Sequence, residues 1–109
     1  MPETAAKPRL SENREMSRFE LRLDDRLVAL ADYVREGETI SFTHTFVEPE
    51  LRGRGLAAEL IEFALSAARD AGLQVLPHCW YVRDHIAARP QLLHLVPESR
   101  RLEFGLAGE

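Results

Sequence analysis

One short turn separates two different hydrophobic periods in this chain, and this change of period constrains the fold more than any other feature. Residues 39–47 alternate apolar and polar side chains, the pattern of a β-strand with one buried face. Residues 56–71 place apolar side chains three and four positions apart, as an amphipathic helix does. Gly72 ends the predicted helix, and residues 73–76 form a further apolar stretch. We therefore expect a strand–helix–strand unit with a right-handed crossover and parallel strands.

The segment before this unit has the pattern of an antiparallel meander. Residues 19–23 alternate apolar and charged side chains, and Asp24-Asp25 predicts a tight turn. Residues 26–34 are the expected hairpin partner, and residues 35–38 make the next turn. The predicted fold class is α+β, with a β-meander followed by a β-α-β crossover.

Length and composition leave room for one domain. A chain of 109 residues with 45% hydrophobic and 29% charged residues most simply makes a single core. Residues 1–17 are polar without sustained periodicity, so we predict a flexible N-terminal tail there. The domain is predicted to span residues 18–97, and residues 98–109 are predicted to be a C-terminal tail.

Pro77 is predicted to interrupt the sheet. Proline has no N–H to donate to a strand ladder, so pairing should weaken at residues 78–80 and a gap should open between neighbouring strands. Residues 82–89 predict a short helix that ends before Pro90. Residues 91–96 are apolar without a clear secondary-structure type.

The charge and the cysteine content exclude some partners and locations. A formal net charge of −4 argues against general affinity for nucleic acid or anionic lipid. No apolar stretch approaches the roughly 18 residues that a membrane-spanning helix needs. Cys79 is the single cysteine, which rules out an internal disulfide and fits a reducing compartment, most simply the cytoplasm. The oligomeric state is not indicated.

The turn Arg52-Gly53-Arg54-Gly55-Leu56-Ala57 has the chemistry of a phosphate site. A helix N-terminus offers unpaired N–H groups and a positive dipole end, and glycine lets an anion approach the backbone closely. Arg52 and Arg54 add the local positive charge that the chain as a whole lacks. An ordinary strand-to-helix turn can have the same composition, so the flanking elements decide whether this turn is read as a phosphate site.

With those elements, the chain resembles the GCN5-related N-acetyltransferase (GNAT) superfamily over roughly residues 19–96. The stretches that carry the resemblance are TISFTHTFVEPELRGRGLAAELIEFALSAARDAG and LQVLPHCWYV. The acyl-CoA signature of the superfamily, Arg/Gln-x-x-Gly-x-Gly/Ala, falls on Arg52, Gly55 and Ala57. Three further pieces look like a group of very small single-domain GNAT-like proteins: His44-Thr45, Pro77-x-Cys79 and Tyr81-Val82.

The resemblance implies acetyl-CoA as the cofactor and an amine as the acceptor. The glycine–arginine turn would wrap the pyrophosphate through backbone N–H groups, and the pantetheine arm would lie in the gap near Val47 and Pro77. No metal is implied. The implied cofactor-binding residues are Phe46, Val47, Arg52, Gly53, Arg54, Gly55, Leu56, Ala57 and Arg83.

His44 and Cys79 are the candidate catalytic residues. With regular alternation, His44 shares a strand face with Ile40, Phe42 and Phe46, where it is the only polar side chain and can accept the proton of the amine. It can equally be a histidine at the core edge, bonded to backbone. Cys79 lies just after the predicted gap, where it can act as a nucleophile, protonate the departing CoA thiolate, or simply pack.

Two features depart from larger members of the superfamily. Those enzymes use a tyrosine on the helix after the splayed strand to protonate the leaving thiolate, whereas this chain has Ala87-Ala88-Arg89 there and Tyr81 lies too early. Larger members also insert helices between their first two strands, where this chain has only Asp24-Asp25. We therefore expect an open, shallow acceptor side.

Three functions compete on this reading. The first is an acetyl-CoA-dependent N-acetyltransferase that acts on an unidentified protein or small-molecule amine. The second is a non-catalytic module that binds acyl-CoA or regulates another protein. The third is a small protein-interaction domain in which the glycine–arginine turn is only a turn.

Overall fold

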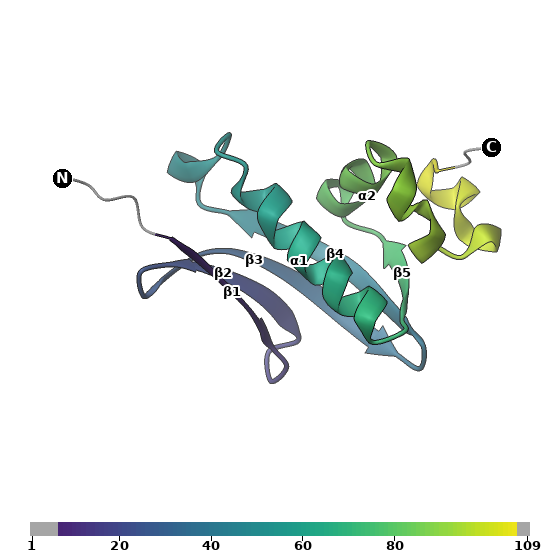
Figure 1. Ribbon diagram of the computed structural model, residues 1–109, viewed down its shortest axis with the longest axis horizontal. Coiled ribbons are helices and arrows are strands. Elements are labelled where there is room, and N and C mark those ends of the chain that lie inside the picture. The colour runs from purple at the N-terminus through teal and green to yellow at the C-terminus, as the bar shows by residue number, and fades with distance from the viewer. Residues whose placement is uncertain (1–6, 107–109) are drawn as a thin grey trace.

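The computed structural model describes residues 7–106 and contains one five-stranded sheet with helices packed against it (Figure 1). The strands are β1 (Pro8–Asn13), β2 (Arg18–Leu23), β3 (Arg26–Glu36), β4 (Thr39–Val47) and β5 (Gln74–Pro77). The α-helices are α1 (Leu56–Asp70) and α2 (Trp80–Ala87). Four short 3₁₀ helices complete the described part: η1 (Pro49–Leu51), η2 (Pro90–Leu95), η3 (Glu98–Arg100) and η4 (Leu102–Phe104).

The strands lie side by side in the order in which they occur in the chain. Strands β1 to β4 are antiparallel neighbours, and β5 joins β4 in parallel after the crossover through α1. This arrangement confirms the predicted α+β class, with a meander followed by a β-α-β unit.

Helix α1 packs on one face of the sheet, in front of β4 in Figure 1, and contacts all five strands. Its buried side chains are the six that the helical period selects: Leu56, Leu60, Ile61, Ala64, Leu65 and Ala68. They pack on aromatic side chains of the sheet, among which Phe19 and Phe42 are at most 1% exposed. Burial of this apolar stripe is the main contribution of α1 to stability.

The prediction that structure begins at Arg18 is wrong, because residues 8–13 form β1. Leu10 of β1 lies opposite Leu21 of β2 and packs against the core. An edge strand pairs on one side only, and this one contains a single large apolar residue, so it left little periodic signal. Residues 1–6 of the predicted tail lie outside the described residues.

The predicted C-terminal tail is also structured as far as Leu106. This stretch contains η3 and η4, and Leu106 is 5% exposed. The ring of Phe104 lies edge-on to His78, with 5.1 Å between centroids. Three-residue 3₁₀ turns have no period long enough to be recognised in a sequence, and residues 107–109 are outside the described part.

A β-bulge in β4 corrects the predicted face of His44. Asp32 of β3 lies opposite His44, whereas the next residue, Tyr33, lies opposite Phe42, so Thr43 has no partner of its own on β3. After this extra residue the alternation is reversed. Ile40, Phe42, Thr45 and Val47 are buried, while His44 and Phe46 are exposed on the other face.

The predicted gap beside Pro77 is confirmed. The parallel ladder runs from Thr39 opposite Gln74 to Phe42 opposite Pro77 and ends there. The N–H of Cys79 still donates to the carbonyl of Phe42, at 2.8 Å, and the chain then turns into α2. Residues 43–47 of β4 therefore continue without a ladder partner on the β5 side.

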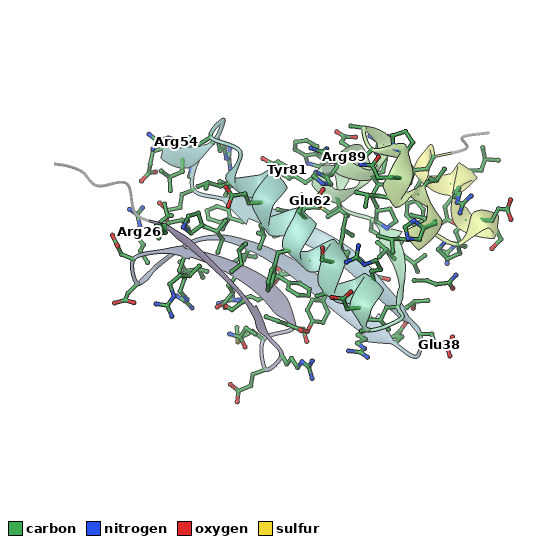
Figure 2. All side chains as sticks on the ribbon, in the orientation of Figure 1. Arg26, Glu38, Arg54, Glu62, Tyr81 and Arg89 are labelled. Carbon is green, nitrogen blue, oxygen red and sulfur yellow. The ribbon has the colours of Figure 1, made fainter. Side chains whose placement is uncertain are left out.

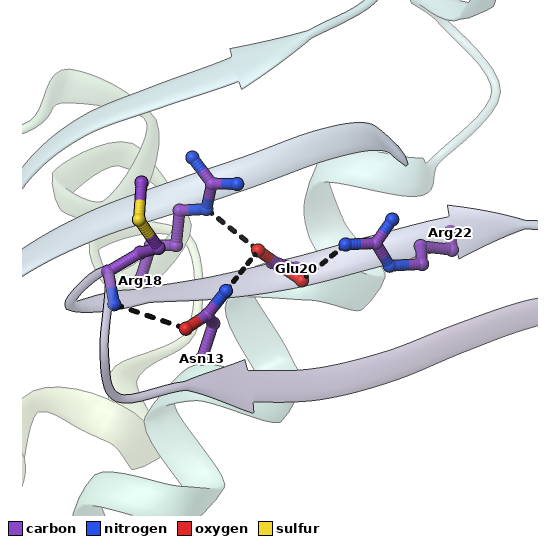
Figure 3. Close-up of polar contacts among 5 residues, drawn as sticks. Asn13, Arg18, Glu20 and Arg22 are labelled. Carbon is purple, nitrogen blue, oxygen red and sulfur yellow. Dashed lines mark hydrogen bonds and ion pairs between the residues drawn. The ribbon is translucent and has the colours of Figure 1, made fainter. Parts of the chain in front are cut away.

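The sheet face opposite α1 contains a buried carboxylate. Glu20 of β2 is 3% exposed and accepts hydrogen bonds from Arg18, Arg22 and Asn13 at 2.8 to 3.0 Å (Figure 3). Burial opposes ionisation of Glu20, but the hydrogen bonds from Arg18, Asn13 and Arg22 outweigh it and lower the pKa of this carboxyl below its ordinary value. Arg18 and Arg22 lie on β2 like Glu20 itself, so the bond from Asn13 is the one of these contacts that joins β1 to β2.

Candidate cofactor-binding and catalytic site

The loop between β4 and α1 is held by polar contacts at its base. The N–H of Glu48 donates to the carbonyl of Val28, and Arg26 of β3 pairs with Glu48 and, at 3.0 Å, with Glu50. The Nε of Arg52 donates to the carbonyl of Val47 at 3.1 Å. These contacts fix where β4 ends, so the following residues are presented in a defined position.

Two glycines bring the backbone from this base to the start of α1. Gly53 and Gly55 have φ angles of +84° and +80°, in the left-handed region that residues with a Cβ rarely adopt. Gly55 is the N-cap of α1, and no side chain caps the helix. The first N–H groups of α1 consequently have neither an intrahelical acceptor nor a capping side chain.

Positive charge gathers at the same loop. Arg54 lies at its tip, beyond the end of β4 (Figure 2), and is exposed, as is Arg52. Among residues 7–106, no acidic side chain lies within ion-pair distance of either arginine. An anionic ligand at this loop would therefore not have to displace an internal salt bridge.

A cavity of about 80 Å³ lies inside the loop. Six of its lining residues are ones that the sequence assigned to the cofactor: Val47, Arg52, Gly53, Gly55, Leu56 and Ala57. Leu51 and Tyr81 complete the lining. Sequence reasoning placed Tyr81 before the second helix, but α2 begins at Trp80, which puts Tyr81 in its first turn and beside the loop. A predicted helix that began at Trp80 would have placed Tyr81 here.

The structure does not bring Arg83 or the side chain of Phe46 to this cavity. Arg83 is two residues beyond Tyr81, roughly 200° further around α2. It pairs with Asp84 at 2.8 Å and lines a different pocket, together with His78 and Gly105. Phe46 is 38% exposed on the face opposite α1, so only its backbone lies along the gap.

Thr45 of β4 and Cys79, which precedes α2, are in contact across the gap. Both side chains are buried, at 6% exposure each. The Sγ of Cys79 donates to the Oγ1 of Thr45 at 3.2 Å. Thr45 lies on β4 beyond the last ladder pair, and Cys79 is the N-cap of α2. The thiol is therefore at the inner end of the gap, on the α1 side of the sheet.

His44 and Cys79 are not side by side. His44 is exposed on the face opposite α1, across from Asp32, whereas Cys79 belongs to the core on the α1 face. The two candidate catalytic residues therefore flank the unpaired stretch of β4 from opposite faces of the sheet.

His85 of α2 is buried, at 7% exposure. Its Nε2 lies 2.6 Å from Oε2 of Glu62, and the Nε of Arg89 lies 3.5 Å from the same oxygen. These contacts hold α2 against α1 and so set the position of Tyr81 and Cys79.

A family model described as GCN5-related N-acetyl-transferase matches residues 18–95. The chain belongs to the GCN5-related N-acetyltransferase family. Three relatives called Protein NATD1 agree with this and with the narrower likeness to very small members of the family. The protein of Xenopus tropicalis is 32% identical over 75% of this chain and 77% of its own length. The proteins of Gallus gallus and Homo sapiens are 33% and 32% identical over 78% and 75% of this chain and 82% and 74% of theirs.

A solved structure shows the same fold at low sequence identity. Ard1 from Thermoplasma volcanium superposes with a TM-score of 0.50 and 18% identity, over 54% of this chain. The chain spans 41% of the length of that protein. Family and fold together support acetyl transfer as the general type of activity. None of the helices within residues 7–106 has the length and apolar character needed to cross a membrane.

Proposed function

We propose that this protein binds acetyl-CoA and transfers the acetyl group to an amine in a ternary complex. The observation that carries the proposal is the end of the β4–β5 ladder at Phe42 and Pro77, next to an α1 N-terminus that no side chain caps. Unpaired strand backbone binds an extended ligand that carries amides, as pantetheine does. The helix N-terminus and two arginines suit the pyrophosphate at the other end of the same ligand.

In this proposal the loop holds only part of the cofactor. The cavity of about 80 Å³ is too small for a whole coenzyme, so the pantetheine arm lies in the gap along residues 43–47. Phe46 and Val47 contribute backbone groups there. Arg52 is already bonded to Val47 through Nε, which leaves its terminal guanidinium nitrogens for phosphate. Arg83 is not given a cofactor role, because it lines the pocket beside Gly105.

His44 and Cys79 keep distinct catalytic roles. Attack on a thioester needs a base for the incoming amine and an acid for the departing sulfur. His44 is accessible on the face away from α1, and an amine approaching from that side meets it first. Cys79 lies on the α1 face, where it protonates the CoA thiolate. Base and acid on opposite sides of the gap fit direct transfer without a covalent acetyl-cysteine.

Tyr81 is the competing proton donor. Its position in the first turn of α2, where it lines the cavity inside the loop, supports a role as the acid. Comparing Cys79→Ser with Tyr81→Phe decides between them. Loss of kcat by more than about tenfold in one variant only identifies the acid, on the usual scale of acid catalysis. A trapped acetyl-protein that disappears in Cys79→Ser would instead show a covalent route.

A second candidate function is binding of acyl-CoA without transfer. The turn between β1 and β2 consists of residues 14–17, so no helix is inserted there to form an acceptor wall. From the sequence, we placed the missing helices at Asp24-Asp25, but the first two strands are joined by residues 14–17. The expectation of an open acceptor side is unchanged by this correction. A regulatory module that binds acyl-CoA without transfer needs the cofactor site but no wall that holds an acceptor.

Calorimetry with acetyl-CoA tests the cofactor site. We expect Arg54→Ala to weaken binding about fivefold to tenfold, the effect of one lost charged phosphate contact. Arg69→Ala removes an exposed arginine at the opposite end of α1 and should leave the affinity unchanged. No binding by the unaltered protein at millimolar acetyl-CoA would reject both the transferase and the binding module.

A mass-spectrometric acceptor screen then separates the enzyme from the binding module. The protein is incubated with acetyl-CoA and with pools of peptides, polyamines and small amines, and products heavier by one acetyl group are sought. His44→Ala should abolish most of the signal while leaving acetyl-CoA affinity intact. Binding without any product across the pools would favour the regulatory module.

A further inference from the structure

The bulge at Thr43 decides which β4 side chain faces the thiol of Cys79. In a regular strand, the residue two positions after Phe42 would share its face, and that residue is His44. The extra residue moves His44 to the exposed face and turns Thr45 inward instead. Bulges re-aim side chains in this way beside active sites.

The contact that results lies across the gap and not along one strand. Thr45 belongs to the arm that continues β4, and Cys79 belongs to the arm that leads into α2. Their side chains meet at 3.2 Å, beyond the last ladder pair at Phe42 and Pro77. Val47, two residues after Thr45 on the same face, lines the cavity inside the loop. The Thr45–Cys79 pair is therefore the next buried group inward from that cavity along β4.

A hydroxyl suits a sulfur that changes its protonation state. Threonine can accept a hydrogen bond through its lone pairs or donate one through its O–H. In the structure, the Cys79 thiol donates to Thr45. Once the sulfur has lost its proton, rotation of the Thr45 hydroxyl hydrogen lets the same oxygen donate to the thiolate. A hydrogen bond to a charged group is worth more than one to a neutral group, so the contact strengthens as the sulfur ionises.

We propose that Thr45 is a positioning residue that holds the Cys79 sulfur in both of its protonation states. The proposal rests on the transferase function proposed above. As the amine nitrogen bonds to the thioester carbon, the carbon–sulfur bond breaks and its electron pair goes to the CoA sulfur. The Cys79 S–H gives its proton to that sulfur, and Thr45 stabilises the thiolate left behind. His44 takes the proton that the amine loses and releases it to solvent, and Cys79 regains one from solvent, so protons balance.

Thiol chemistry tests this directly, because Cys79 is the single cysteine of the chain. The variants are Thr45→Val, which keeps the shape without the hydroxyl, Thr45→Ser, which restores the hydroxyl, and Thr43→Val, a matched loss of hydroxyl at the exposed bulge residue. Alkylation of the folded protein by iodoacetamide is followed by intact mass. The rate at pH 7.5 is divided by the plateau rate at high pH, which removes any change in access to the thiol.

We expect this ratio to fall about tenfold in Thr45→Val, the factor that corresponds to about 1.4 kcal/mol. Thr45→Ser should return it to within twofold of the unaltered protein, and Thr43→Val should not change it. An unchanged ratio in Thr45→Val, or a loss that Thr45→Ser does not restore, overturns the proposal.

The acetyl-transfer assay adds a second readout. Thr45→Val should lower kcat while KM for acetyl-CoA stays within twofold, because the residue acts through Cys79 and not on the cofactor. A protein that transfers no acetyl group rejects the proposed function, whereas the alkylation ratio still measures the effect of Thr45 on the thiol. The two failures are therefore distinguishable.

Discussion

The Nε2 of His85 lies 2.6 Å from a carboxylate oxygen of Glu62, and this pair joins α2 to α1 across 23 residues of sequence. The imidazole is buried, whereas the carboxylate is half exposed. The contact therefore matters chiefly through what it does for the histidine. Glu62 supplies a hydrogen-bond partner for the buried Nε2 of His85.

Glu62→Ala should destabilise the protein by about 1–3 kcal/mol, because it leaves the buried His85 nitrogen without that partner. For a domain of this size the loss corresponds to a fall in Tm of several degrees, measurable by circular dichroism. Glu38→Ala removes the same charge from an exposed turn and should change Tm little. Equal Tm values for the two variants would show that the pair does not stabilise α2.

Glu20→Gln should make the free energy of unfolding depend less on pH in the acidic range. Because the folded pKa of Glu20 is lowered, its contribution is present above the unfolded pKa of about 4.5 and is lost as pH falls through the folded value. At pH 6.5 we expect the variant to be less stable by about 2 kcal/mol. This is below the cost for a fully buried pair, since Arg18 and Arg22 reach solvent. Urea unfolding at pH 6.5 and pH 3.5 tests this: the difference should shrink at the lower pH.

Tyr33→Phe should remove one of two phenol titrations. Burial first, and then the hydrogen bond that its hydroxyl donates to Glu12 at 2.5 Å, raise the pKa of Tyr33 to about 12. Its folded pKa lies above the unfolded value, so the stabilisation is complete below pH 10 and is lost as pH rises toward 12. Tyrosinate absorbance should lose its most alkaline component in Tyr33→Phe and retain it in Tyr81→Phe. Retention in both variants would refute the assignment.

Gly55→Ala should separate stability from cofactor binding. At a φ of +80° an alanine costs about 1–2 kcal/mol, although no atom lies within 4 Å of the added Cβ. Gly37→Ala, at a φ of +56° in the β3–β4 turn, should cost a similar amount. Only Gly55→Ala should also weaken acetyl-CoA binding in calorimetry, because it alters the N-cap of α1. Equal affinities would place the cofactor elsewhere.

Strong periodicity made α1 predictable, and weak periodicity hid β1. The six buried residues of α1 recur at helical spacing over four turns, so no alternative pattern competes. Residues 8–13 offer only Leu10 as a large apolar side chain, and an edge strand needs no more than that to pair. The gap beside Pro77 was predictable because proline lacks an N–H, a property independent of context.

The faces of β4 were not predictable from sequence. Thr43, His44 and Thr45 are three consecutive polar residues, so either way of alternating along this stretch turns a polar side chain inward. The bulge becomes visible only with the partner strand, on which Tyr33 lies opposite Phe42 and Asp32 opposite His44. The burial of His85 was not predictable either, because its partner Glu62 lies on another helix, 23 residues away in the sequence.

The order of the strands has a consequence for folding kinetics. Strands β1 to β4 pair with their neighbours in the chain, and each such pairing closes a short hairpin loop. The β4–β5 pairing instead brings together Phe42 and Pro77, with all of α1 between them. Loop-closure entropy makes such distant contacts slow to form. The meander should therefore assemble first, and the half of the molecule that contains Cys79, α2 and the gap should be the last to fold and the first to open.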